Sequence, residues 1–307
     1  MSDFGIIGIG RIGTSMARNM SSNGIIVSLF DKSHNSLDNL KNDYPELDSS
    51  LVFDDINKFI SSISKPRKVL ILVPSGTALD EVISLLIQHL DSNDILIDGG
   101  NTNPNVSFEN HQTIKSKNLL YLGMGVSGGV EGVLKGPSIM IGGDTNAFNQ
   151  VKNIFSRITS ETINGSKSFE FFGDSNQGHF VKMIHNGIEY VEMQLISSIY
   201  YLMINSKKYS YEDVAKIFNK WNDIDLNSYL LEISLLKLTE KTDDSYLLDR
   251  IDDKADDNGT GRWMLKHAID LGCSVSMLNS AIDSRFISNN NSTCLLYTSD
   301  AADDVIS

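Results

Sequence analysis

Residues 4–13 read Phe4-Gly-Ile-Ile-Gly8-Ile-Gly10-Arg-Ile-Gly13, a short apolar run that leads into three glycines spaced Gly-x-Gly-x-x-Gly. The apolar run predicts a strand over Phe4–Ile9, and the segment Arg11–Ser22 predicts a helix directly after it. A strand, a glycine turn and a helix in this order leave free N–H groups at the positive end of the helix dipole, where a pyrophosphate binds. The stretch therefore predicts a dinucleotide-binding βαβ unit.

An acidic residue stands about twenty positions further on, as this unit requires. The second predicted strand, Ile25–Phe30, ends at Asp31, whose carboxylate can accept hydrogen bonds from ribose hydroxyls. A carboxylate repels a 2′-phosphate, whereas Lys32 offers a compensating positive charge. The cofactor predicted from these residues is NAD or NADP, with NAD favoured.

The rest of the chain changes texture near Gly173–Gln177. Up to about Phe172, strand-like and helix-like segments alternate, which predicts a mainly parallel sheet covered by helices on both faces. From about Asn176 only helix-length segments follow, and the longest is Gly178–Ser206. We expect an α/β Rossmann-like N-terminal domain over residues 1–175 and an all-α C-terminal domain, for substrate binding and dimerisation, over residues 176–290. The individual segments expected are the strands Val69–Val73, Ile95–Ile97, Leu119–Leu122 and Ile139–Ile141, and the helices Thr77–Leu90, Ser210–Trp221, Asn227–Leu238, Trp263–Leu271 and Val275–Ser288.

The last residues have no periodicity connected with what precedes them. The run Cys294-Leu-Leu-Tyr-Thr-Ser-Asp-Ala-Ala-Asp-Asp304 resembles the translated adapter read-through that ends some metagenomic reading frames. We expect residues 291–307 to be a disordered tail of this artificial kind; a genuine disordered tail is the alternative.

Composition excludes several classes of protein. The formal net charge of −13 opposes binding to nucleic acid, and no apolar run is long enough to span a bilayer. The two cysteines, Cys273 and Cys294, offer neither a disulfide framework nor a metal site. A location in the cytoplasm is expected, with no metal.

Three further segments carry candidate site residues. Asp98-Gly-Gly-Asn101 follows a strand at the end where ligands bind in parallel sheets. The glycine-rich run Gly123–Gly132, which contains Ser127, suggests backbone brought close to a ligand. On a helical wheel, the polar residues of 182–190 fall within about 140°, opposite an apolar side. These polar residues are Lys182, His185, Asn186, Glu189 and Tyr190.

Together with the first glycine fingerprint, these segments resemble the 6-phosphogluconate dehydrogenase family. The likeness continues through Gly259-Thr260-Gly-Arg-Trp263 and Ser284-Arg285-Phe286, and so spans roughly residues 3 to 288. The wider β-hydroxyacid dehydrogenase superfamily shares the Ser-Gly-Gly loop and the lysine that matches Lys182. The run from His185 to Tyr190 favours the phosphogluconate branch.

The resemblance implies a homodimer that oxidises and decarboxylates 6-phosphogluconate to ribulose 5-phosphate and CO2 while NAD or NADP is reduced, a step of the pentose phosphate pathway. Lys182 would be the base that takes the proton of the 3-hydroxyl, and Glu189 would protonate carbon 1. A lysine in that role needs a lowered pKa. Substrate would be bound by Asn101, Ser127, Gly128, Gly129, His185, Asn186, Tyr190, Thr260 and Arg285, and cofactor by Gly8, Gly10, Arg11, Ile12, Gly13, Asp31, Lys32, Val73 and Asn101.

Some positions depart from the family pattern. Asn258 replaces a phosphate-binding lysine, Asp31-Lys-Ser replaces Asn-Arg-Thr, and Leu72-Val-Pro74-Ser-Gly replaces Val-Lys-Ala-Gly. Long members also donate an Arg and a His from the partner's tail. Two alternatives therefore stay open. One is a 3-hydroxyisobutyrate-type β-hydroxyacid dehydrogenase, which would have no use for Tyr190 and Arg285 as phosphate ligands, and the other is a truncated, catalytically silent cofactor-binding protein.

Overall fold

A computed structural model of the chain describes residues 1–32, 40–47, 50–242, 245–252 and 254–289. The expected tail, residues 291–307, lies outside these described residues. Two compact units divide at Met183–Ile184, inside the long helix α9 (Gln177–Asn205), which follows the predicted boundary directly. Among the described residues, no helix is both long and apolar enough to cross a membrane.

The first unit is built on an eight-stranded sheet in the order β3-β2-β1-β4-β5-β6-β7-β8. All neighbouring strands are parallel except β6 and β7, which pair antiparallel. The strands are β1 (Phe4–Ile7), β2 (Val27–Phe30), β3 (Leu51–Phe53), β4 (Lys68–Ile71), β5 (Ile95–Asp98), β6 (Leu120–Ser127), β7 (Ser138–Gly143) and β8 (Phe169–Phe171). The predicted Rossmann-like domain is confirmed, and β3 is a strand that sequence patterning missed.

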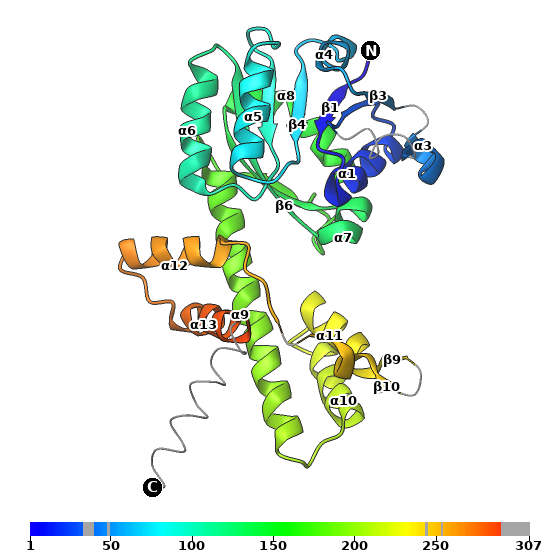
Figure 1. Cartoon of the computed structure of the whole chain (residues 1–307), viewed down its shortest axis with the longest axis vertical. Helices are drawn as coiled ribbons and strands as arrows, with labels where there is room; N and C mark the ends of the chain where they lie inside the picture. The colour runs from blue at the N-terminus through cyan, green and yellow to red at the C-terminus, as the bar shows by residue number, and fades with distance from the viewer. Residues whose placement is uncertain (33–39, 48–49, 243–244, 253, 290–307) are drawn as a thin grey trace, which may run out of the picture. The chain divides into compact units, whose positions relative to one another are not determined.

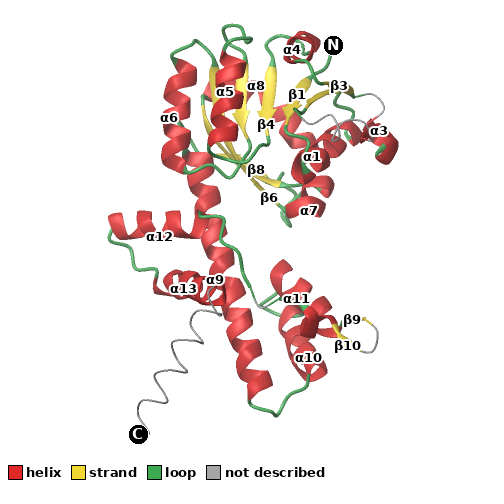
Figure 2. Ribbon diagram, viewed as in Figure 1, coloured by secondary structure: helices red, strands yellow, loops and turns green. Residues whose placement is uncertain are grey.

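Helices cover both faces of this sheet, as Figures 1 and 2 show. The apolar sides of α1, α7 and α8 share one core with residues such as Phe4 and Ile6, and those of α4, α5 and α6 share a second core with Ile7 and Val69. Buried strands packed on both faces read as continuous apolar runs, which is why β1 and β5 were recognisable in the sequence. The helices are α1 (Arg11–Ser22), α3 (Leu40–Asp43), α4 (Ile56–Ser62), α5 (Thr77–Ile87), α6 (Pro104–Lys115), α7 (Gly129–Lys135) and α8 (Thr145–Ile158), with a 3₁₀ turn η1 at Pro45–Leu47.

In its described residues, the second unit is helical apart from a short antiparallel pair, β9 (Lys241–Thr242) and β10 (Ser245–Tyr246). It has two small cores. The C-terminal half of α9 packs with α10 and α11 around Phe218, and an earlier part of α9 packs with α12 and α13 around Tyr190 and Ile282. The elements after α9 are α10 (Tyr211–Asn222), α11 (Tyr229–Thr239), the 3₁₀ turn η2 (Leu247–Arg250), α12 (Thr260–Asp270) and α13 (Ser276–Asn289).

Candidate active site

The glycine turn after β1 has the geometry that its spacing predicts. Gly8 has φ of +93°, which L side chains rarely adopt, and a Cβ there would lie 2.6 Å from the carbonyl oxygen of Leu72. A Cβ on Gly13 would overlap the carbonyl oxygen of Gly8, so glycine is what lets α1 pack this close to the turn. A Cβ on Gly10 would meet no atom within 4 Å. The open space over Gly10, at the N-terminus of α1, fits a pyrophosphate.

A pocket of about 310 Å³ lies beside this turn. Asp31 lines it at the end of β2, and its carboxylate accepts a hydrogen bond of 2.8 Å from the N–H of Ile9. Lys32 donates to Glu81 of α5 at 2.9 Å, and this hydrogen bond and the lysine's charge lower the pKa of the Glu81 carboxyl. The lining residues are Ile7, Gly8, Gly10, Phe30, Asp31, Lys32, Leu72, Val73, Pro74, Ala78, Glu81 and Val82. An apolar floor with a carboxylate at its edge suits the adenosine half of a dinucleotide.

Four of the residues predicted to bind cofactor do not line this pocket. Arg11 and Ile12 are in the first turn of α1, with Arg11 exposed and Ile12 packed against the core. Gly13 lies under the turn, and the exposed Asn101 follows β5. Their contribution to cofactor binding stays a prediction.

A buried polar network lies at the carboxyl end of β5. Asp98 is fully buried and accepts a hydrogen bond of 3.0 Å from the N–H of Gly100, which holds the turn that leads to Asn101. Its Oδ2 lies 3.3 Å from Nε2 of His179, although the two groups are not aligned as a hydrogen bond. The Tyr121 hydroxyl, which also contacts Ser107 at 2.9 Å, is 3.4 Å from the same oxygen. The network joins β5 and β6 to the first turn of α9.

Burial by itself would raise the pKa of the Asp98 carboxyl, but His179 and the N–H of Gly100 outweigh it, so the pKa lies below its usual value. Burial, together with the charge of Asp98, raises the pKa of Tyr121 well above its usual value. Asp98 is therefore the anion and Tyr121 the neutral donor in this network at neutral pH.

The stability of the first unit should depend on the charge of Asp98. A lowered folded-state pKa means that the contribution is present above the unfolded value of about 3.9 and is lost as pH falls through the lower folded value. Asp98→Asn should lower the free energy of unfolding at pH 7 by about 2 kcal/mol. Urea titrations should show that this difference begins to shrink below about pH 4, where the unfolded carboxyl becomes protonated, and disappears as pH falls through the lower folded-state pKa. A difference that stays constant at every pH would assign it to packing instead of charge.

Gly123 and Gly125, within the run expected to bring backbone close to a ligand, and Gly142 have a packing reason instead. Strand β6 continues through Ser127, and the N-terminal turns of α9 pack directly on this strand and on β7. A Cβ on Gly123 would lie 2.8 Å from the His179 ring, and a Cβ on Gly125 would overlap the side chain of Lys182. A Cβ on Gly142 would overlap the backbone of Gly178 in the same way. The small residues on both sides allow this close approach of helix and sheet, as a Gly–Gly contact generally does.

This packing buries Lys182, whose exposed fraction is 8%. Ser127 ends β6, and Gly128 and Gly129, both with positive φ, begin α7. Because β5 and β6 are parallel, their carboxyl ends share one edge of the sheet. The structure thus brings Asn101, Ser127 and Lys182, which lie far apart in the sequence, to one end of the first unit.

In the second unit, two predicted phosphate ligands, Tyr190 and Arg285, are stacked, and the helix that begins at Thr260 packs against Tyr190. The guanidinium of Arg285 lies 3.9 Å from the centre of the ring, and Gly261, which follows Thr260 in the first turn of α12, packs on its edge. The Tyr190 hydroxyl donates to Asp257 at 3.3 Å, and Arg262 pairs with the same carboxylate at 2.6 Å. Asp257 is an acidic neighbour that sequence reasoning did not consider.

His185 and Glu189 also lie side by side in α9. Nδ1 of His185 is 3.3 Å from Oε2 of Glu189, one helical turn away, and 3.4 Å from Oδ1 of Asn186. Gly187 has a packing reason that the sequence did not reveal, because a Cβ there would overlap the sulfur of Met264 in α12. Packing against α12 therefore accounts for the presence of this glycine in a helix.

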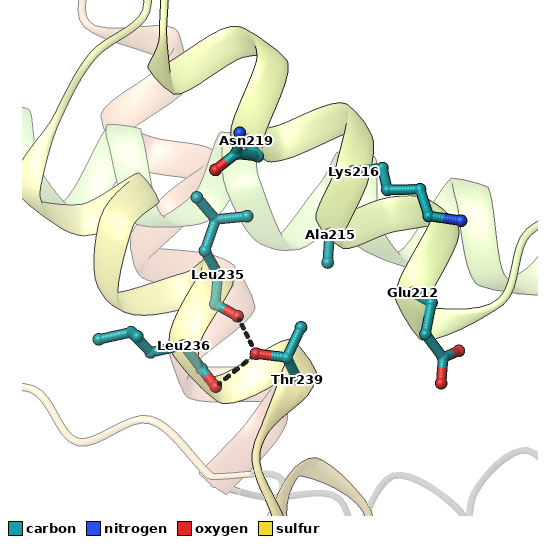
Figure 3. Close-up of a pocket in the computed structure, with 7 residues that line it drawn as sticks. All are labelled: Glu212, Ala215, Lys216, Asn219, Leu235, Leu236 and Thr239. Atoms are coloured by element: carbon teal, nitrogen blue, oxygen red, sulfur yellow. Dashed lines mark hydrogen bonds between the residues drawn. The ribbon is translucent and has the colours of Figure 1, made fainter.

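A larger pocket, of about 500 Å³, lies between α10 and α11 (Figure 3). The hydroxyl of Thr239 turns back to the carbonyls of Leu235 and Leu236, so it is satisfied within its own helix. The residues that line this pocket are Glu212, Ala215, Lys216, Asn219, Leu235, Leu236 and Thr239. None of the predicted site residues is among them, so this pocket carries no part of the proposed chemistry.

Fold and site together define the class: a dinucleotide-binding protein with a Rossmann-like unit, followed by a helical unit. Comparison with known families matches residues 3–166 to the NAD binding domain of 6-phosphogluconate dehydrogenase and residues 178–300 to the C-terminal domain of the same enzyme. The chain belongs to the 6-phosphogluconate dehydrogenase family.

Individual relatives agree with this assignment. The decarboxylating 6-phosphogluconate dehydrogenase of Staphylococcus aureus is 38% identical over 294 residues, which cover 93% of this chain and 61% of the relative. The solved 6-phosphogluconate dehydrogenase of Plasmodium falciparum is 35% identical with a TM-score of 0.91, covering 97% of this chain and 64% of the other. The chain thus spans less than two thirds of the length of both. A 3-hydroxyisobutyrate dehydrogenase of Mycobacterium tuberculosis, 16% identical with a TM-score of 0.70 over 94% of each chain, shares the fold.

Proposed function

We propose that the chain catalyses the oxidative decarboxylation of 6-phosphogluconate to ribulose 5-phosphate and CO2 with reduction of a nicotinamide dinucleotide. The observation that carries this proposal is the buried Lys182, placed over Gly125 beside the carboxyl ends of β5 and β6. Ligands of open parallel sheets bind at this edge. Family membership supports the particular reaction, and the relatives from Staphylococcus aureus and Plasmodium falciparum carry its name.

In this proposal, Lys182 is the base. Its unprotonated amine removes the proton of the substrate's 3-hydroxyl, and the bound dinucleotide supplies the hydride acceptor. The resulting β-keto acid loses CO2 because its ketone accepts the electron pair. The ammonium of Lys182, which now carries the proton, stabilises the developing enolate through its charge. Burial of Lys182 favours this role, since desolvation disfavours the charged amine before the reaction.

Glu189 then protonates carbon 1 of the enediol. Its side chain is on the same helix as Lys182, two turns further on, and its Oε2 lies 3.3 Å from Nδ1 of His185, which positions the carboxyl. Asn101, His185 and Asn186 would position substrate hydroxyls, and Ser127, Gly128 and Gly129 would hold the substrate carboxylate.

The phosphate would be bound by Tyr190, Thr260 and Arg285. The stacking of Arg285 on Tyr190 supports this assignment because it holds a guanidinium in place next to a phenol. The carboxylate of Asp257 beside them, paired with Arg262, reduces the local positive charge, as does Asn258 where family members have lysine. We therefore expect weaker phosphate binding than in the longer relatives.

We further propose NAD as the preferred cofactor, from the carboxylate of Asp31 at the ribose edge of the pocket. A homodimer, a cytoplasmic location and a place in the pentose phosphate pathway are parts of the same proposal, and family membership supports them.

The test is formation of reduced nicotinamide by the purified chain, offered 6-phosphogluconate or 3-hydroxyisobutyrate with each dinucleotide. We expect turnover of 6-phosphogluconate with release of CO2. Turnover of the unphosphorylated acid alone would contradict the proposal. Calorimetric titration with NADH and NADPH, run in parallel, separates failure of cofactor binding from failure of catalysis.

A further inference from the structure

The ribose edge of the dinucleotide pocket contains a charged group that the glycine fingerprint does not predict. Glu81, on the first turns of α5, lines the pocket together with Asp31 and Lys32. Among the lining residues that the structure describes, these three carry the charge, two carboxylates against one ammonium.

Each of the three groups has a defined partner. The Asp31 carboxylate accepts the N–H of Ile9 at 2.8 Å, which holds it against the glycine turn. The Lys32 ammonium donates to Oε2 of Glu81 at 2.9 Å, and the pKa of Glu81 is lowered by this contact. Lys32, the one cation among the described residues that line the pocket, is therefore paired before any ligand binds.

NAD and NADP make different demands on this edge. The ribose of NAD presents neutral hydroxyls that can donate to Asp31, whereas NADP presents a phosphate with nearly two negative charges. To hold that phosphate, Lys32 must give up Glu81, which leaves a second carboxylate facing the phosphate. Glu81 thus competes with the 2′-phosphate for the same ammonium.

We propose that Glu81 is a specificity-determining residue that selects NAD over NADP by occupying Lys32. The inference rests on the proposed dinucleotide-binding function and adds the residue that decides between the two cofactors.

The decisive experiment measures dissociation constants for NADH and NADPH by calorimetry, which requires no catalytic activity. In Glu81→Gln, the freed Lys32 should tighten NADPH binding by about tenfold and change NADH binding by less than about twofold. The expected change is modest because the side chains of Lys32 and Glu81 are 64% and 58% exposed, so water screens the pair. Asp80→Asn is the matched control, since Asp80 is an exposed carboxylate on the same helix that does not line the pocket.

A double-mutant cycle with Lys32→Met tests whether Glu81 acts through the lysine. We expect Lys32→Met to weaken NADPH binding further in the wild type, because Glu81 is left uncompensated, and to cancel the gain in the Glu81→Gln background. An equal change of NADPH affinity in Glu81→Gln and Asp80→Asn would show that only the net charge of the protein matters, and would overturn the inference. Tighter binding of NADPH than of NADH by the wild type would overturn it as well. Binding of both dinucleotides with an unaltered preference in Glu81→Gln would overturn the inference alone. If neither NADH nor NADPH binds, the proposed function and the inference are overturned together.

Discussion

Lys182→Met is expected to abolish oxidation of 6-phosphogluconate, with kcat/KM reduced by roughly 10³-fold or more, because a positioned general base contributes about 10²–10⁴ and the ammonium's later charge stabilisation is lost as well. Methionine keeps the unbranched stem that passes over Gly125, so the packing of α9 on β6 should persist. Dinucleotide affinity should stay within about twofold of the wild type, as the adenosine pocket does not include Lys182. Steady-state kinetics and calorimetry on the same preparation measure both.

Two further variants test whether the loss of activity is due to the base at position 182. Lys135→Met, at an exposed lysine of α7, is the control for loss of one lysine and should leave kcat/KM unchanged. Lys182→Arg keeps the positive charge but has no accessible neutral form near pH 7, so it should be as inactive as Lys182→Met. Activity in either Lys182 variant above about a tenth of the wild type would refute the assignment of Lys182 as the base.

Gly13→Ala is expected to produce the second large effect, on cofactor binding. The added Cβ overlaps the carbonyl oxygen of Gly8, so α1 must move away from the turn. Overpacking of this kind costs about 1–3 kcal/mol of stability. Displacement of the N–H groups of α1 should weaken dinucleotide binding by about 100-fold or more, since these groups are the pyrophosphate site. Thermal unfolding and calorimetric titration with NADH measure the two effects.

Gly10→Ala provides the contrast within the same turn. Its Cβ meets no protein atom within 4 Å, so stability should change by less than about 0.5 kcal/mol. The methyl group nonetheless enters the space over the N-terminus of α1, and dinucleotide binding should fall. If Gly10→Ala destabilised the protein as much as Gly13→Ala, the roles of the two glycines as described would be wrong.

Much of the fold is encoded in local patterns that need no tertiary information. The helix Arg11–Ser22 has the bounds predicted, and the ends of α9 to α13 differ from prediction by at most three residues. Apolar periodicity and the change of texture near Gln177 depend only on neighbours along the chain. The strand β3 was missed because a short strand with partly exposed sides resembles a loop in sequence. The extension of β6 to Ser127 was missed because Gly123 and Gly125 interrupt the apolar pattern.

The candidate site likewise has parts that the sequence predicts and contacts that only the structure shows. The glycine turn, Asp31 and the polar face of α9 could be identified from their spacing, since each function depends on residues close in sequence. Asp98 was visible in the motif Asp98-Gly-Gly-Asn101, but its pairing with His179 was not. The same holds for Lys32 and Glu81, which are 49 positions apart.

Chain order and residue type were thus sufficient for the class of fold, the cofactor turn and the family of this protein. Packing decided the rest: that Gly123, Gly125 and Gly142 make room for α9 instead of a ligand, that Gly187 accommodates Met264, and that Glu81 reaches Lys32. The physical reason is that periodicity reports which side of an element is buried, whereas the partner on that side is chosen by how sheet and helices stack, which involves atoms distant in sequence.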